Sequence, residues 1–175
     1  MSAWNGWYHV NGNTYGTWLP GDKRGWRSRH HKQHVDGDYK NPPPPGTYDD
    51  LHEHAKGVMG QPAVVLNVDQ RRIAGEALVE MLLKQEVEVL ALSVDAVHFH
   101  LLARFGDLPA RAVVGRAKKH ATFTLQRGGH RRRVWGKRAR VLPIKDRAHQ
   151  VNVFRYILSH ATSGAWTWRF ESDSD

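Results

Sequence analysis

The chain has no cysteine among its 175 residues, and this absence excludes several kinds of chemistry at once. Disulfides, thiolate nucleophiles, iron–sulfur clusters and cysteine-based zinc sites all require thiols. Long apolar runs are missing too, because the best candidate, residues 87–94, is short and contains Glu88. A membrane-spanning helix needs about 20 apolar residues, so we expect no membrane association.

The chain has fewer acidic residues than basic ones. Against 26 Lys and Arg there are only 17 Asp and Glu, so the formal net charge is +9 with all 12 His neutral. Such a surplus of positive charge favours an anionic partner, and nucleic acid is the first candidate. The N-terminal residues offer neither a basic segment nor an apolar core, which predicts a cytoplasmic protein rather than a secreted one. With DNA as the partner, the expected location is the nucleoid.

The cations gather in three groups. One group is typical of a solvated face, but three in a small domain favour a shared surface for a polyanion. Trp26 is the best candidate for stacking on a base, because cations surround it in the sequence, and Trp135 comes next. The candidate DNA-binding residues are Lys23, Arg24, Trp26 and Arg27; Lys118 and Lys119; and Arg131, Arg132, Arg133, Lys137 and Arg138.

Hydrophobic periodicity and turn residues predict one α+β domain over residues 1–175. A first strand within residues 4–19 is followed by a long irregular insertion at residues 20–61, whose proline run cannot join a sheet. The order then alternates strands and helices, which predicts an antiparallel sheet with helices packed mainly on one face. The expected elements are a helix at 69–85 capped by Asp69, strands at 87–94 and 97–101, a helix at 109–127, a strand at 134–144, a helix at 148–161 capped by Asp146, and a tail at 163–175.

Two short patterns carry chemistry. In His98-Phe99-His100, residues two apart on a strand share a face, so both imidazoles project together, as in half of a divalent metal site. On the last helix, Tyr156 and His160 share a face four residues apart. Taken singly, the first pattern is more often a chance histidine pair, and the second an ordinary amphipathic helix with an exposed tyrosine.

Together the two patterns predict more than either does alone. If the tyrosine face of the helix meets the histidine strand, in the same chain or in a partner's, three imidazoles can hold a metal and leave positions open for a phosphate oxygen. Tyr156 could then attack that phosphate and form a covalent phosphotyrosyl intermediate. No separate acid or base is evident in the sequence.

The chain resembles the small single-tyrosine transposases of the HUH nuclease superfamily, which include the REP-associated tyrosine transposases. Residues 97–102 are similar to their histidine–hydrophobe–histidine strand, and residues 155–160 to their catalytic helix. The third ligand in that helix is often Gln or Asn in relatives, and here it is His160. Residues 15–22 resemble the first strand and turn of one subgroup, and the motifs follow the family's order over roughly residues 7–19 and 64–162.

The resemblance implies a ferredoxin-like or RRM-like core and the cutting of single-stranded DNA beside a small hairpin. It implies Tyr156 as the nucleophile that stays on the 5′ phosphate, and a divalent ion, magnesium or manganese, held by His98, His100 and His160. Imidazole ligands allow manganese, zinc or cobalt as readily as magnesium. Relatives occur as dimers, with a tyrosine helix serving the partner's histidines, and as monomers, so both states stay open.

Two other functions are compatible with the sequence. A domesticated descendant could bind structured nucleic acid without cutting it, although a binder needs neither the tyrosine nor the three histidines. A replication initiator or relaxase of the same superfamily is the other. The histidine pair precedes the tyrosine here in the transposase manner, without a helicase region or a tandem second tyrosine.

Overall fold

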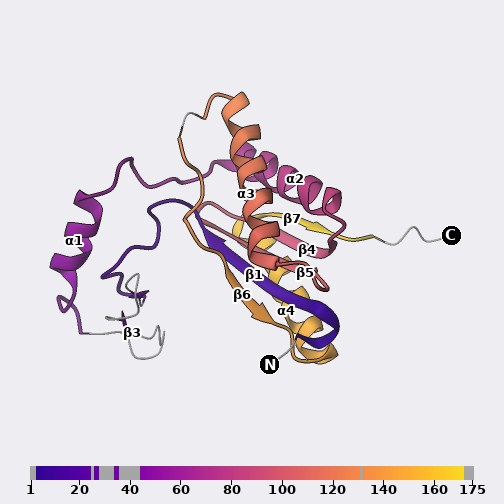
Figure 1. Cartoon of the computed structure of the whole chain (residues 1–175). Helices are drawn as coiled ribbons and strands as arrows, with labels where there is room; N and C mark the ends of the chain where they lie inside the picture. Colours follow the sequence, from indigo (N-terminus) through magenta and orange to yellow (C-terminus); the bar gives the residue numbers. More distant parts are fainter. Residues whose placement is uncertain (1–2, 25, 28–33, 36–43, 131, 172–175) are drawn as a thin grey trace.

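The computed structural model describes residues 3–24, 26–27, 34–35, 44–130 and 132–171. Its centre is a five-stranded sheet with the order β6-β1-β5-β4-β7, and every neighbouring pair in it is antiparallel (Figure 1). This confirms the predicted α+β class with an antiparallel sheet, which is consistent with a ferredoxin-like fold. The strands are β1 (Trp7–Asn13), β4 (Glu88–Val94), β5 (His98–Arg104), β6 (Arg140–Pro143) and β7 (Trp166–Arg169).

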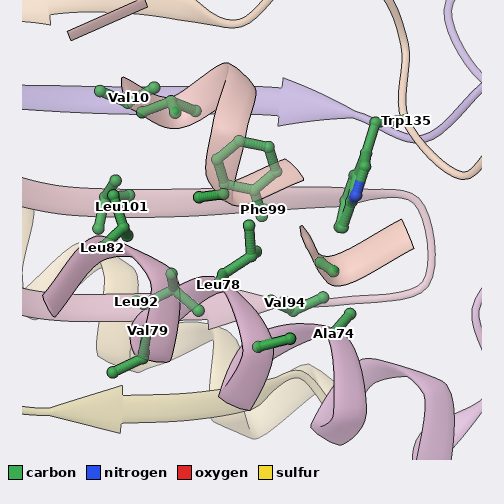
Figure 2. Packing of buried hydrophobic residues seen from close by; sticks show 14 of the residues in the cluster. Val10, Ala74, Leu78, Val79, Leu82, Leu92, Val94, Phe99, Leu101 and Trp135 are labelled. Carbon is green, nitrogen blue, oxygen red and sulfur yellow. The ribbon is translucent and has the colours of Figure 1, made fainter. Parts of the chain in front are cut away.

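Helices α2 (Val68–Lys84) and α3 (Ala110–Arg127) cover one face of the sheet (Figure 1). Figure 2 shows their core, in which Leu78 and Leu82 of α2 lie beside Phe99 and Leu101 of β5. Two of the three large helices thus share a face, as expected. Burial of these aliphatic and aromatic side chains is the main source of stability for such a layer.

Helix α4 (Arg147–Ser159) lies on the opposite face of the sheet (Figure 1). Asp146 caps it as predicted, because the Asp146 Oδ1 atom accepts a hydrogen bond from the backbone N–H of His149 at 2.7 Å. Its Val153 and Ile157 bury a second, smaller core against Leu102 of β5. The side chains of β5 therefore alternate between two cores, and α4 sits over the face that carries the two histidines.

Gly12 marks the closest packing between β1 and β5. It lies opposite Phe99, and a Cβ atom at this position would lie 2.6 Å from the Phe99 ring. Only glycine fits between this strand and the aromatic ring without a shift of one or the other. Asn11 and Asn13, the neighbours of Gly12 on β1, point to the opposite face.

Several expected boundaries differ. The cap of α2 is Asn67, not Asp69, because Asn67 and Gln70 form a reciprocal capping box. The strand expected at 134–144 is shorter in the structure. Only β6 pairs with β1 along its length, and a single isolated bridge joins Trp135 to Thr14. Part of the segment expected as a tail at 163–175 is a strand, because β7 pairs with β4 as an edge of the main sheet.

The insertion at 20–61 contains more regular structure than expected. It holds α1 (Asp49–Gly57) and a two-stranded ladder of β2 (Trp26–Arg27) and β3 (His34–Val35). Short 3-10 turns occur at Trp4–Gly6 and His160–Ser163. Among the helices described, none has the length and apolar character that crossing a membrane requires.

Candidate functional site

Three histidines from two elements meet above the sheet. His98 and His100 project from β5 toward α4, and His160 follows the last turn of α4. One nitrogen from each imidazole lies within 4.8 Å of the others, so the group can hold a metal ion. The ring centroids are 4.8 Å apart for His98 and His100, and 4.8 Å apart for His100 and His160. We call these three residues the histidine triad.

His98 is oriented by Asp95, in the turn just before β5. The His98 Nδ1 atom lies 2.9 Å from the Asp95 Oδ2 atom, while the other carboxylate oxygen accepts the backbone N–H groups of Val97 and His98. Burial alone would raise the pKa of the Asp95 carboxyl, but the hydrogen bonds outweigh it and lower this pKa to about 2. A fixed carboxylate at Nδ1 leaves Nε2 as the nitrogen that His98 offers to a metal.

His100 is oriented by a second histidine, His9 of β1. The His9 Nε2 atom and the His100 Nδ1 atom are 3.0 Å apart, and the two rings are stacked at 5.2 Å. One of these nitrogens must donate a hydrogen and the other accept it. Because the bond uses Nδ1 of His100, its Nε2 atom is the one available for a metal at the triad. His9 belongs to no motif recognised in the sequence.

His160 supplies a direct sign that the triad suits a metal. Its Nε2 atom is buried and has no hydrogen-bond partner among the described residues. Buried polar atoms normally have a hydrogen-bond partner. A buried imidazole nitrogen without one, beside two other imidazoles, is what a metal-binding group would show. Three imidazole nitrogens side by side form a donor set that can hold a metal ion.

The imidazoles of His9, His100 and His160 are held in the neutral form. Burial, with His98, His9 and His160 close by, lowers the pKa of His100 to about 3. Burial likewise lowers the pKa of His9 to about 4, assisted by His149 and Arg140. The pKa of His160 is lowered by burial and by His98. A neutral imidazole keeps the lone pair that a metal needs, so protons compete weakly for these ligands at neutral pH.

Tyr156 lies beside the triad in the same chain. Its ring centroid is 4.8 Å from that of His160 and 5.2 Å from that of His100. The ring is 48% exposed, so a substrate can reach it from solvent. Helical spacing places Tyr156 and His160 on one side of α4. The adjoining Ile157 is buried against Leu102 of β5, so this side of the helix meets the sheet face that carries the histidines. One chain therefore assembles all four side chains.

The predicted DNA-binding cations lie in varied environments. Lys119, Arg132, Arg133, Lys137 and Arg138 are exposed. Lys118 is buried, and its Nζ atom donates to the carbonyl of Gly136 at 2.7 Å, which leaves it little access to a phosphate. Burial lowers the pKa of Lys118 to about 8.

Two cations of the insertion, Lys23 and Arg24, can be compared with the prediction. Lys23 and Arg24 are exposed, but the guanidinium of Arg24 pairs with Asp22 at 2.5 Å and stacks over Trp18. Arg27 belongs to β2, and nothing is described of its side chain; Arg131 lies outside the described residues.

Neither tryptophan proposed for stacking is available to a base. Trp26 is 6% exposed and packs edge-on against Tyr48, and Trp135 is 3% exposed and packs edge-on against Phe99 (Figure 2). Trp135 is buried in the main core and Trp26 within the insertion, because burial of a large ring is favourable whatever the charge of its neighbours in the sequence. The prediction of stacking by Trp26 is therefore wrong for this structure.

The role of Asp95 can be tested by Asp95→Asn. The amide keeps the size of the side chain but loses the charge that fixes His98, so we expect affinity for manganese to fall by about 10- to 100-fold. Titration calorimetry with Mn²⁺ measures this directly. Asp69→Asn on the exposed start of α2 is the matched control and should bind as the wild type does. Equal affinities for both variants would contradict an orienting role for Asp95.

His9 can be tested by comparing two substitutions. His9→Ala removes the partner of His100 Nδ1, and we expect affinity for manganese to fall by about tenfold or more. His9→Gln places an amide acceptor at a similar reach, so it should recover most of that affinity. If Gln fails as badly as Ala while both proteins keep the wild-type melting temperature, the hydrogen bond is not what matters.

Comparisons with known protein families, with curated proteins and with solved structures found no match.

Proposed function

We propose that the chain is a metal-dependent single-stranded DNA endonuclease and strand transferase that acts at hairpin-bearing DNA ends, as in DNA transposition. The observation that supports it best is the position of Tyr156, one helical turn before His160 and 5.2 Å from His100 between ring centroids. A nucleophile beside a metal-binding triad, in a basic chain, suits attack on a phosphodiester. A protein that only binds nucleic acid has no use for this arrangement.

The reaction balances without an external source of energy. The Tyr156 oxygen forms a bond to the phosphorus as the bond from phosphorus to the 3′ oxygen breaks, and the proton lost by the phenol is matched by one gained at the free 3′ hydroxyl. Attack of a second strand's 3′ hydroxyl on the phosphotyrosine reverses these bonds. Both steps exchange one phosphate ester for another, so strand transfer is close to isoenergetic.

The chain's own residues position these events. His98, His100 and His160 would hold a divalent ion, which supplies charge withdrawal at the non-bridging phosphate oxygens. Asp95 and His9 fix the orientation of the two strand histidines. Helix α4 carries Tyr156, and the 3-10 turn that continues it begins at His160, which sets the phenol and the third imidazole in a fixed geometry.

Manganese is the proposed ion. Magnesium prefers oxygen ligands and gives up its water reluctantly, whereas imidazole nitrogens suit transition metals. The triad contains three imidazoles and no carboxylate, since Asp95 is engaged through His98.

The proposed function is tested by incubating the protein with labelled, hairpin-bearing single strands and Mn²⁺. The expected product is a protein–DNA adduct that survives denaturation and disappears after protease treatment. Duplex DNA of the same sequence is the control. Absence of the adduct with every hairpin strand from the flanks of the chain's own gene, with or without metal, would refute the proposal.

A further inference from the structure

Helix α4 covers only half of the sheet face on which the triad stands. Its main contacts are with β4, β5 and β7, whereas β1 and β6 lie on the other side of β5 and touch it less. The triad therefore lies at the border between a covered and an uncovered half of this face.

The uncovered half presents polar side chains in register with the triad. On β1, Asn11 lies directly opposite His100, and Asn13 lies directly opposite His98. On β6, Arg140 lies directly opposite Asn11. Partners that face each other across antiparallel strands share one face of the sheet, with Cβ atoms about 4.5–5.5 Å apart. We call Asn11, Asn13 and Arg140 the polar shelf.

Access to the triad is unequal on its two sides. Ser93 of β4, opposite His100 on the covered side, is 2% exposed. On the shelf side Asn11 and Asn13 are only half-buried, and Arg140 is exposed. A strand of nucleic acid that reaches the triad along the sheet must therefore cross the shelf.

The shelf has the chemistry of a backbone-binding surface. Neither amide has a hydrogen-bond partner among the described residues, so their donors and acceptors face outward unused. β1 and β6 contain no acidic residue, and the exposed cations Lys137 and Arg138 lead directly into β6. Arginine and amide side chains are common partners of phosphate and sugar oxygens.

We propose that the polar shelf binds the sugar–phosphate backbone of the single strand next to the phosphate held at the triad. The inference rests on the proposed function for the identity of the strand. Asn11 and Asn13 lie two residues apart on β1, about 6.8 Å along the strand, so the two amides contact successive positions of the bound backbone. Arg140 pairs with a phosphate beyond them, on the side away from α4.

The test is equilibrium binding of a fluorescein-labelled oligothymidylate, measured by anisotropy with EDTA present so that no cutting occurs. The double variant Asn11→Asp, Asn13→Asp places two negative charges against phosphates, and we expect its affinity to fall by about tenfold or more. The matched control carries Asn5→Asp and Asn67→Asp, which add the same charge at exposed positions off the shelf. Affinities of the two double variants within about twofold of each other would overturn the proposal.

Arg140→Gln gives a second measurement. Loss of one phosphate contact should lower the slope of log affinity against log salt by about 1, while Arg72→Gln on α2 leaves the slope unchanged. An unchanged slope for Arg140→Gln would overturn the assignment of Arg140 to a phosphate.

Because the chain lacks cysteine, a single thiol can be placed on the shelf without interference. Asn13→Cys should form a disulfide with an oligonucleotide that carries a thiol tether on its backbone, whereas Leu83→Cys, exposed on α2, should not. Equal cross-linking at both positions would overturn the proposed path. These measurements need no catalysis, so the shelf can hold even if no adduct forms, and the adduct can form even if the shelf variants bind normally.

Discussion

Tyr156→Phe is expected to abolish the covalent protein–DNA adduct while leaving the binding of hairpin DNA nearly intact. The substitution removes only the phenolic oxygen and keeps the ring that packs beside His100 and His160. Loss of a nucleophile costs several powers of ten in rate, so adduct should fall below detection, by about 10³-fold or more. Denaturing gels of labelled single strands with Mn²⁺ measure it.

The control is Tyr8→Phe, which makes the same change elsewhere on the sheet. Tyr8 packs edge-on against Phe105 in the core on the far side of β1, away from the triad. Its variant should form adduct at the wild-type rate. If Tyr156→Phe also cuts at the full rate, the phenol is not the nucleophile and the proposed mechanism fails.

His100→Ala is expected to remove tight metal binding and, with it, cutting. His100 is the most buried member of the triad and contacts both other imidazoles. Loss of an outer partner of a ligand typically costs about 10- to 100-fold in metal affinity, so loss of the ligand itself should cost more than about 100-fold. Calorimetry with Mn²⁺ and the adduct assay read the two consequences separately.

His120→Ala is the matched control, since His120 is also an imidazole with a partner, Glu80, but lies between α2 and α3. It should bind manganese normally. Mixing Tyr156→Phe with His100→Ala adds a further check, because one chain assembles the whole site and the mixture should stay inactive. Restored adduct in the mixture would mean that tyrosine and triad act across two chains.

The sequence predicted the parts of the site that depend on local geometry. Strand alternation placed His98 and His100 on one face, and helical spacing placed Tyr156 with His160. That the two faces would meet could only be a hypothesis, because it depends on which side of the sheet α4 occupies. The packing of Ile157 against Leu102 decides it, and this contact joins residues far apart in the chain.

His9, Asn11 and Asn13 were missed for the same reason. No spacing within β1 marks them, and their relation to His100 and His98 exists only through the register of β1 against β5. The sequence did carry a signal for Asp95, because this carboxylate lies three positions before the strand histidine His98. A carboxylate at that spacing from a candidate ligand is worth testing as its orienting partner.

Charge and aromatic content misled at single residues. Lys118 and Trp26 stand among surface cations in the sequence, yet both are buried. Burial follows from the face that a residue occupies in its element, and Lys118 is on the side of α3 that meets the sheet alongside Val114 and Ala121. The composition of a segment cannot distinguish its two faces.

Gly12 affects the functional site although it contacts none of the site's residues, because it sets the spacing between β1 and β5. A methyl group there would have to push β1 away from the buried ring of Phe99. The strand that would move carries His9 and the two amides on its other face. A genetic screen for loss of activity would therefore recover substitutions at Gly12, which touches neither metal nor DNA. Such substitutions would act by changing the distance between two strands and not by removing a binding contact.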